Sequence, residues 1–310
     1  MIDKPEVAAQ AANLLGEGAL WSPADRRVMW TDIIDKRLWS YDPATGASQS
    51  VALPSRLACF APLGGSTILA GFAEGLDRFD WTIGRRELVA PIEPDLPTTR
   101  VNDGKLDRRG RLVFGTMDEQ QGGAKPIGSV WSYDGRSPPR ALFGGVRIAN
   151  SIAFSPDGRT MYFADTPTRT ILAFDYDLDE GRVSNRRVFA ATDVGHPDGS
   201  TVDADGCLWN AEWDGARIVR YRPDGRVDRV IALPCQRVTC CAFGGPKLST
   251  LFVTSARVGL DDAALASQPL AGALFAVEVG VAGLSDAPFT GAVSLSSSGW
   301  SRESGPIPIP

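Results

Sequence analysis

The stretch DGSTVDADGCLWNAEW (Asp198 to Trp213) contains two short apolar strands joined by a tight turn. The turn is the Asp205-Gly206 step, because glycine tolerates positive φ and aspartate bonds its own neighbouring backbone. The earlier Asp198-Gly199 step precedes the first strand instead of joining two strands. Asp205 is therefore expected to make the hairpin, and the carboxylate of Asp198 is left for chemistry.

The same two-strand unit occurs six times along the chain. Each copy starts with a polar residue and has a bulky apolar residue four places later. A turn rich in Pro, Gly or Asp then leads into a second apolar strand, and several copies continue with a third, such as RLWSYD or ILAFDYD. The copies start 39, 46, 48, 48 and 41 residues apart, at Glu17, Arg56, Asn102, Asn150, Asp198 and Thr239.

This repeat decides the fold class. Short strands with turn signals at this period predict four-stranded blades arranged radially, not alternating βαβ units. We expect an all-β fold, a six-bladed β-propeller of four-stranded antiparallel blades, as a single domain over residues 1–310. Residues 6–15 are expected to supply the missing outer strand of the last blade, so that the N-terminal strand closes the propeller. Residues 290–310 have the composition of a C-terminal tail, and residues 261–272 that of a short helical or looped insertion.

Composition limits the partners and the compartment. The net charge is -5 and no Lys/Arg run exceeds two residues, which disfavours nucleic acid or an anionic membrane as partner. No apolar run is long enough to span a bilayer, and the first residues lack the pattern of a secretory signal. The five cysteines are odd in number and form no C-x-x-C pair, so we expect reduced, buried thiols in a cytoplasmic protein. No obligate protein partner is indicated.

The first position of each repeat is polar, although the strand that follows it is apolar. In a propeller these six positions lie at the mouth of the central channel. Polar groups crowded into one concavity are costly to desolvate unless they have partners. Their two carboxylates and two amides form a plausible ligand set for a hard divalent cation. Any one of these residues taken alone would be interpreted as a turn residue.

Two other kinds of active site are disfavoured. The chain has one histidine, His196, which precedes a proline and is expected in a loop. With a single histidine, a three-histidine zinc site is excluded. No G-x-S-x-G motif is present, which disfavours a serine hydrolase of that type.

Four segments resemble the SMP-30/gluconolactonase (regucalcin-like) family of sugar lactonases. They are GEGALW, RVNDGKLDRRGRLVFGTM, ANSIAFSPDGRTMYFADT and HPDGSTVDADGCLWNAEWDGARIVRY. Each segment alone is a weak signal, but four in order at blade spacing are a strong one. The resemblance covers essentially the whole chain. The later segments FGGPKLSTLFVTSARVGLDD and QPLAGALFAVEV are most similar to bacterial aldonolactonases.

The resemblance implies a single divalent metal held by Glu17, Asn150 and Asp198. These are three of the six positions that the repeat picks out. Three oxygen ligands and water suit Ca²⁺, Mg²⁺ or Mn²⁺, and Zn²⁺ and Fe²⁺ also accept such a site.

The resemblance also implies substrate contacts. Arg100 and Asn102, in the R-x-N-D-G motif, match residues that contact the hydroxyl and carbonyl oxygens of the substrate. The family often has a further acidic contact a few residues after G-T-M. Glu119 is assigned to this role here, and its neighbours Asp118, Gln120 and Gln121 are alternatives.

The activity implied is that of a carboxylic ester hydrolase that opens an aldono-lactone, such as glucono-, xylono- or arabinono-lactone, to the aldonic acid. A small-molecule sugar lactone is then the partner. Asp198 is the candidate general base toward water, and a hydroxide on the metal is the alternative. Two other functions stay open. One is a metal-dependent esterase or phosphotriesterase of the same fold, and the other is a non-catalytic metal-binding propeller scaffold.

Overall fold

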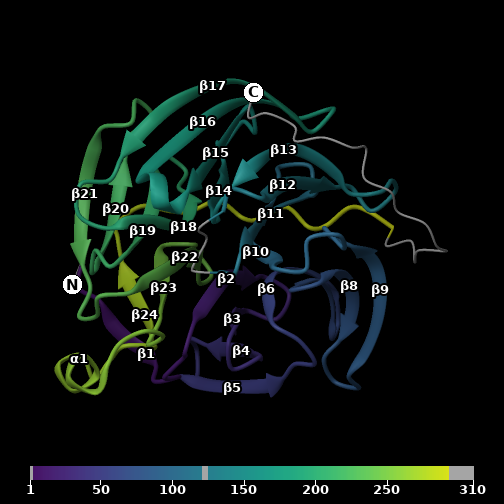
Figure 1. Cartoon of the computed structure of the whole chain (residues 1–310). Coiled ribbons are helices and arrows are strands. Elements are labelled where there is room, and N and C mark those ends of the chain that lie inside the picture. The colour runs from purple at the N-terminus through teal and green to yellow at the C-terminus, as the bar shows by residue number, and fades with distance from the viewer. Residues whose placement is uncertain (1–2, 121–124, 293–310) are drawn as a thin grey trace. The chain divides into compact units, whose positions relative to one another are not determined.

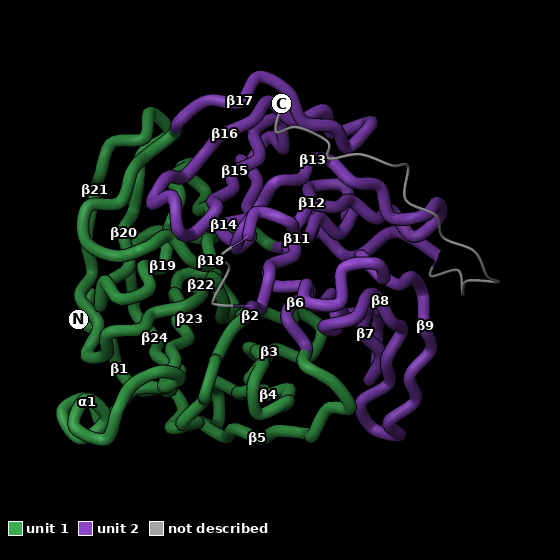
Figure 2. The backbone as a smooth tube through the Cα atoms, viewed as in Figure 1, with its two compact units in different colours: residues 1–56, 189–285 green, residues 57–188, 286–310 purple. Residues whose placement is uncertain are grey.

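The computed structural model describes residues 3–120 and 125–292, whose regular secondary structure is almost entirely β-strand (Figure 1). The chain divides into two compact units (Figure 2). Unit 1 holds residues 1–56 and 189–285, and unit 2 holds residues 57–188 and 286–310. Each unit contains three four-stranded sheets with antiparallel neighbours. The fold class is that of a six-bladed β-propeller, as predicted, with one sheet per blade. The single domain over the whole chain stays a prediction, and residues 293–310 of the expected tail lie outside the described residues.

Unit 1 contains blades 1, 5 and 6. Blade 1 consists of β2 (Gly16–Ser22), β3 (Arg27–Asp32), β4 (Arg37–Asp42) and β5 (Ala47–Ala52). Blade 5 consists of β18 (His196–Val202), β19 (Leu208–Trp213), β20 (Arg217–Tyr221) and β21 (Val227–Ala232). Blade 6 consists of β22 (Val238–Gly244), β23 (Thr250–Ser255), β24 (Leu274–Glu278) and β1 (Glu6–Ala9).

Unit 2 contains blades 2, 3 and 4. Blade 2 consists of β6 (Leu57–Gly64), β7 (Thr67–Phe72), β8 (Gly75–Asp80) and β9 (Arg85–Pro91). Blade 3 consists of β10 (Thr99–Leu106), β11 (Leu112–Asp118), β12 (Gly128–Tyr133) and β13 (Arg140–Val146). Blade 4 consists of β14 (Ala149–Phe154), β15 (Thr160–Asp165), β16 (Thr170–Asp177) and β17 (Arg182–Ala191).

The N-terminal strand completes blade 6. In β1, Glu6 and Val7 lie opposite Ala276 and Phe275 of β24, so the outer edge of that strand is paired. The closing strand is confirmed, and it covers residues 6–9 of the expected range 6–15. The insertion before β24 contains the helix α1 (Asp262–Ser267). None of the helices in the described ranges has the length and apolar character needed to span a bilayer.

Apolar side chains pack between neighbouring blades within each unit. In unit 2 the ring of Phe143 lies 5.1 Å from Phe163 across blades 3 and 4. In unit 1 Trp209 lies 6.0 Å from Phe243 across blades 5 and 6. All five cysteines are buried and free of disulfides, as expected. Burial raises the pKa of Cys235 to about 11, so this thiol stays protonated at neutral pH.

The hairpin between β18 and β19 is held by Asp203, not by Asp205 as the sequence suggests. One carboxylate oxygen of Asp203 accepts the backbone N–H groups of Asp205 and Cys207, at 3.0 and 2.9 Å. Gly206, at φ +80°, donates its N–H to the Asp203 carbonyl. Asp at the first and Gly at the fourth position favour a type I turn. The Asp205 carboxylate is exposed and pairs with Arg220.

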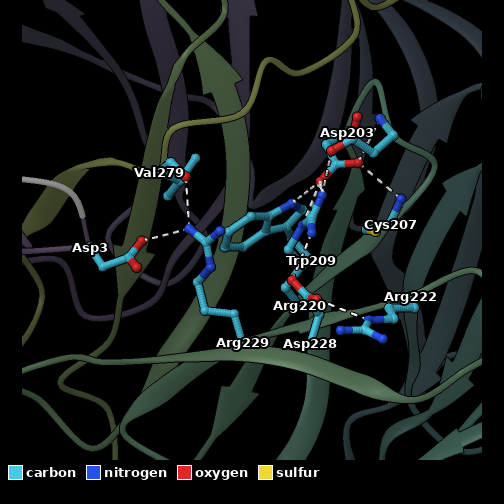
Figure 3. Close-up of polar contacts among 10 residues, drawn as sticks. Asp3, Asp203, Cys207, Trp209, Arg220, Arg222, Asp228, Arg229 and Val279 are labelled. Atoms are coloured by element: carbon cyan, nitrogen blue, oxygen red, sulfur yellow. Dashed lines mark hydrogen bonds and ion pairs between the residues drawn. The ribbon is translucent and has the colours of Figure 1, made fainter.

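The other carboxylate oxygen of Asp203 links the turn to the strands behind it (Figure 3). It accepts the indole N–H of Trp209 and the Nε–H of Arg220, both at 2.8 Å. Asp107 has the same double role in blade 3. It accepts the backbone N–H of Arg111 on one oxygen and the hydroxyl of Tyr176 on the other. Two of the six repeats therefore have a buried aspartate at the same position of the turn.

Candidate functional site

The innermost strand of every blade has a β-bulge or irregularity at or beside the polar repeat position. A bulge bends its strand and re-aims a side chain, and bulges occur preferentially next to active sites. Five of the six polar residues therefore lie within a strand, at its bulge, and Arg56 lies immediately before β6. The register shifts lie at Glu17/Leu20, Leu57/Cys59, Val101/Asp103, Asn150/Ala153, Pro197/Ser200 and Val238/Cys241.

In unit 2 the predicted substrate residues and one predicted metal ligand form a single hydrogen-bonded chain. The guanidinium of Arg100 donates to a carboxylate oxygen of Glu119 at 3.0 Å and to the amide oxygen of Asn102 at 2.8 Å. The amide nitrogen of Asn102 donates to the Ala149 carbonyl at 2.9 Å and to the amide oxygen of Asn150 at 3.3 Å. Of the predicted residues, Arg100, Asn102, Glu119 and Asn150 are thus brought together.

The hydrogen bonds from Arg100 through Asn102 determine whether the oxygen or the nitrogen of the Asn150 amide faces Asn102. A guanidinium can only donate, so Asn102 must turn its oxygen toward Arg100 and its nitrogen toward Asn150. The Asn150 nitrogen in turn donates to the hydroxyl of Thr166 at 2.8 Å. The oxygen of Asn150 therefore lies on the side of Asn102 and accepts a hydrogen bond from it. An amide oxygen is also a group that a hard cation accepts as a ligand. Thr166 was not predicted, although it ends the quoted repeat ANSIAFSPDGRTMYFADT.

The bulge that carries Asn150 is stabilised by Asp103. Ser151 follows Asn150 with φ +58°, an uncommon conformation for a residue with a Cβ. The carboxylate of Asp103 accepts the N–H of Ile152 at 3.1 Å and that of Gly104 at 2.8 Å. Burial raises the pKa of Asp103, and these two accepted hydrogen bonds offset part of the rise. The aspartate of the R-x-N-D-G motif thus accepts hydrogen bonds from backbone N–H groups.

Of the acidic and amide side chains that follow G-T-M, Glu119 pairs with Arg100, at 3.0 Å. The Asp118 side chain is fully buried, and one of its oxygens accepts the N–H of Gln120 at 3.2 Å. Its other oxygen has no hydrogen-bond partner among the residues that the structure describes. Among Asp118, Glu119 and Gln120, the residue in contact with Arg100 is therefore Glu119, and Gln121 lies outside the described residues.

In unit 1 Asp198 lies inside β18 and is 4% exposed, so it is not a turn residue. Its backbone carbonyl accepts the side-chain N–H of Asn210 at 3.2 Å. The next residue, Gly199, packs so closely on β22 that a Cβ there would lie 2.8 Å from the Cα of Cys240. Glycine follows Asp198 because of this close approach between strands. His196 is the first residue of β18, and not a loop residue as expected.

Glu17 occupies the equivalent position in blade 1. It is half-buried in β2, and one of its carboxylate oxygens accepts the N–H of Gly18 at 3.2 Å. Gly18 has φ +61°, which corresponds to the left-handed Ser151 after Asn150. In this unit β2 and β18 both pack against β22, so Glu17 and Asp198 lie on two strands with a common neighbour.

The donors fit a divalent cation. Glu17 and Asp198 offer two carboxylates, and Asn150 presents an oriented amide oxygen. These are the hard oxygen ligands that Ca²⁺ and Mg²⁺ prefer. Among residues 3–120 and 125–292, no three His, Cys, Asp or Glu side chains gather as a metal site. The set predicted from the sequence has only two such side chains, so its third ligand must be the amide of Asn150.

Comparison with known proteins identifies the family. Residues 15–257 match the model of the SMP-30/Gluconolactonase/LRE-like region. The chain belongs to this family. An L-arabinolactonase of Azospirillum brasilense is 42% identical, over 91% of this chain and 94% of its own. A 6-deoxy-6-sulfogluconolactonase of Pseudomonas putida is 34% identical, over 90% of this chain and 96% of its own.

A solved member of the SMP-30/gluconolactonase family has the same fold. It is a calcium-binding protein, regucalcin, of Agrobacterium tumefaciens, 34% identical to this chain. The match has a TM-score of 0.87 and covers 92% of this chain and 97% of that structure. The family resemblance seen in the four sequence segments is thereby confirmed.

Proposed function

We propose that this protein hydrolyses a sugar lactone to the corresponding aldonic acid with the help of one divalent metal ion. The hydrogen-bonded chain from Arg100 through Asn102 to Asn150 carries the proposal, because it joins donors for a polyhydroxylated ligand to an oriented metal ligand. Lactonases among the related proteins support the substrate class. Glucono-, xylono- and arabinono-lactone are the substrates to test first.

Glu17, Asn150 and Asp198 would hold the cation, and their two negative charges would balance it. When bound, the cation supplies Lewis-acid polarisation of the lactone carbonyl, a contribution of roughly several kcal/mol. Ca²⁺, Zn²⁺, Mg²⁺, Mn²⁺ and Fe²⁺ are the candidates. A calcium-binding relative of known structure supports the first of these.

Asp198 would take a proton from the attacking water. The water oxygen bonds to the carbonyl carbon, and the bond from that carbon to the ring oxygen breaks. The ring oxygen takes up the proton that Asp198 removed from the water and leaves as a hydroxyl group. The carboxylic acid then loses its own proton, so the net reaction releases one proton as the aldonate forms. Arg100 and Glu119 would orient the sugar hydroxyls, because a guanidinium and a carboxylate together offer both donors and acceptors.

The function is tested by proton release from a panel of γ- and δ-lactones, followed in a pH-stat. Acid release from at least one aldono-lactone, well above the rate without protein, is expected. If only simple esters or phosphotriesters were cleaved, the function would be that of an esterase or phosphotriesterase instead of a lactonase. No cleavage of any compound, with the metal bound, would indicate a scaffold instead.

Removal of the metal should abolish the activity. After exhaustive chelation, lactone hydrolysis is expected to fall to the rate without protein, because the carbonyl is no longer polarised. Adding back one of the five candidate ions should restore it. Elemental mass spectrometry on the purified and the chelated protein identifies the ion and checks its removal. Full activity in a sample shown to be free of metal would contradict the proposal.

A further inference from the structure

Thr239 is the first position of the sixth repeat and lies at the bulge of β22. It is fully buried. Its hydroxyl donates to the backbone carbonyl of Gly16, the residue just before Glu17. A buried hydroxyl on the inner strand of blade 6 is therefore hydrogen-bonded to the inner strand of blade 1, at the residue beside a predicted metal ligand.

Unit 2 contains the same arrangement with a different side chain. Asn102, the first position of blade 3, donates to the carbonyl of Ala149 at 2.9 Å. Ala149 stands immediately before Asn150, as Gly16 stands immediately before Glu17. In both units, one blade thus uses its own repeat position to hold the backbone that precedes a predicted ligand in the neighbouring blade.

A second hydroxyl, that of Thr254, orients the hydroxyl of Thr239. Its oxygen lies 2.9 Å from the hydroxyl oxygen of Thr254, which is also fully buried. The Thr254 oxygen accepts the N–H of Cys240 at 3.1 Å. Because Thr239 donates its single proton to Gly16, Thr254 is the donor in the bond between the two hydroxyls. The carbonyl of Cys240, at 3.3 Å, is a longer alternative acceptor for the Thr254 proton. Hydrogen bonds in such a chain polarise one another, which strengthens the grip on the Gly16 carbonyl.

The backbone at Gly16 is confined on another side as well. A Cβ on Gly16 would lie 2.8 Å from the carbonyl oxygen of Ser255 and 2.9 Å from the side-chain nitrogen of Asn13. No side chain fits there, so β2 is wedged between these groups and Thr239. The segment before Glu17 has little room to move, whereas Gly18 after it has the left-handed conformation of the bulge.

We propose that Thr239 is a positioning residue that fixes Glu17 in the geometry needed to bind the divalent cation, as Asn102 fixes Asn150. The identity of the bound ion in this proposal rests on the proposed function. The claim that Thr239 holds β2 at Gly16 does not depend on it. Residues that orient metal ligands without touching the metal typically change metal affinity by 10–100-fold when they are replaced.

The test compares Thr239→Val with Thr239→Ser in the full-length protein. Valine keeps the shape and removes the hydroxyl, whereas serine keeps the hydroxyl. Ser22→Ala is the matched control, because it removes a buried hydroxyl from the other end of β2, where Ser22 donates to Asp25. Thr254→Val keeps the Thr239 hydroxyl but removes its donor, so it covers the case that Thr239→Val fails to fold.

Two measurements are made on each variant. Mn²⁺ binding is titrated by the loss of the free-ion signal in electron paramagnetic resonance, and amide hydrogen exchange is followed for residues 14–20. Thr239→Val is expected to weaken Mn²⁺ binding at least tenfold and to speed exchange around Gly16 and Gly18. Thr254→Val should change both in the same direction by less. Thr239→Ser and Ser22→Ala should leave both close to the parent protein.

Unchanged exchange around Gly16 in the folded Thr239→Val protein would overturn the proposal. So would equal losses of Mn²⁺ affinity in Thr239→Val, Thr239→Ser and Ser22→Ala, since they would show general destabilisation. If the parent protein bound no Mn²⁺ or any other candidate ion, the metal part of the proposed function would fail. The exchange data would still decide whether Thr239 holds β2.

Discussion

Asp198→Asn is expected to lower kcat for lactone hydrolysis by about 10²–10⁴-fold, the range for loss of a general base. Asparagine has nearly the shape of aspartate but cannot take a proton from water at neutral pH. It also weakens the negative field that a divalent cation needs, so metal affinity should fall too. The fold should survive, because Asp198 contributes its backbone carbonyl to Asn210 and Gly199 makes the close contact with Cys240.

The matched control is Asp205→Asn, on the hairpin that follows the same strand. The Asp205 carboxylate is exposed and pairs with Arg220 at 2.9 Å, and Arg220 keeps its other partners Asp203 and Asp228. Arg220 is buried, but the Asp205 carboxylate is exposed to water, and a pair that water screens in this way contributes about 0–1 kcal/mol. Activity should therefore be unchanged and stability nearly so. Steady-state kinetics on an aldono-lactone and circular dichroism check both variants. A folded Asp198→Asn protein with the turnover of the parent would remove Asp198 from the mechanism.

The blade repeat could be read from the sequence because its signals are local. A polar first residue, an apolar residue four places on and a turn rich in Pro, Gly or Asp are all contained in about sixteen residues. Each needs only its own hairpin to form. The closing strand also followed from counting, since a last blade with three strands leaves one edge to cover.

The bulges and the contacts between blades could not be predicted in this way. The bond from Asn102 to Ala149 spans 47 residues, and the bond from Thr239 to Gly16 spans 223. Such pairings depend on how neighbouring inner strands approach each other, which no local pattern encodes. The bulge leaves only a faint trace in the sequence. The residue after the ligand position must accept a left-handed or tightly packed backbone, and it is Gly18, Ser151 or Gly199 in the three predicted ligand segments.

The hairpin of blade 5 shows a different kind of error. Asp205-Gly206 fits the two-residue turn that Asp-Gly favours, but the chain uses the four-residue pattern D-x-x-G that starts at Asp203. Both patterns are present in the sequence, and the second recurs as Asp107 to Gly110. The repeat within the chain would have favoured Asp203. The choice is decided by the buried donors, Trp209 and Arg220, that only Asp203 can reach.

Asp203→Ala is expected to have the largest effect on stability, a loss of about 3–5 kcal/mol in the free energy of unfolding. This is the range measured when one partner of a buried ion pair is removed. The Trp209 indole N–H and the N–H of Cys207 would lose their acceptor in a fully or almost fully buried region. Arg220 would lose Asp203, the partner it meets in the interior (Figure 3). It would keep the more exposed Asp205 and Asp228.

Chemical denaturation followed by tryptophan fluorescence measures this loss, because Trp209 itself reports on the hairpin. Asp205→Ala is the control on the same turn and should cost no more than about 1 kcal/mol. Asp107→Ala should resemble Asp203→Ala, since Asp107 accepts equivalent bonds from Arg111 and Tyr176 in unit 2. The folded fraction of Asp203→Ala should keep its kcat, because no proposed catalytic residue contacts this carboxylate. Equal stability of Asp203→Ala and Asp205→Ala would mean that the buried carboxylate does not hold the blade.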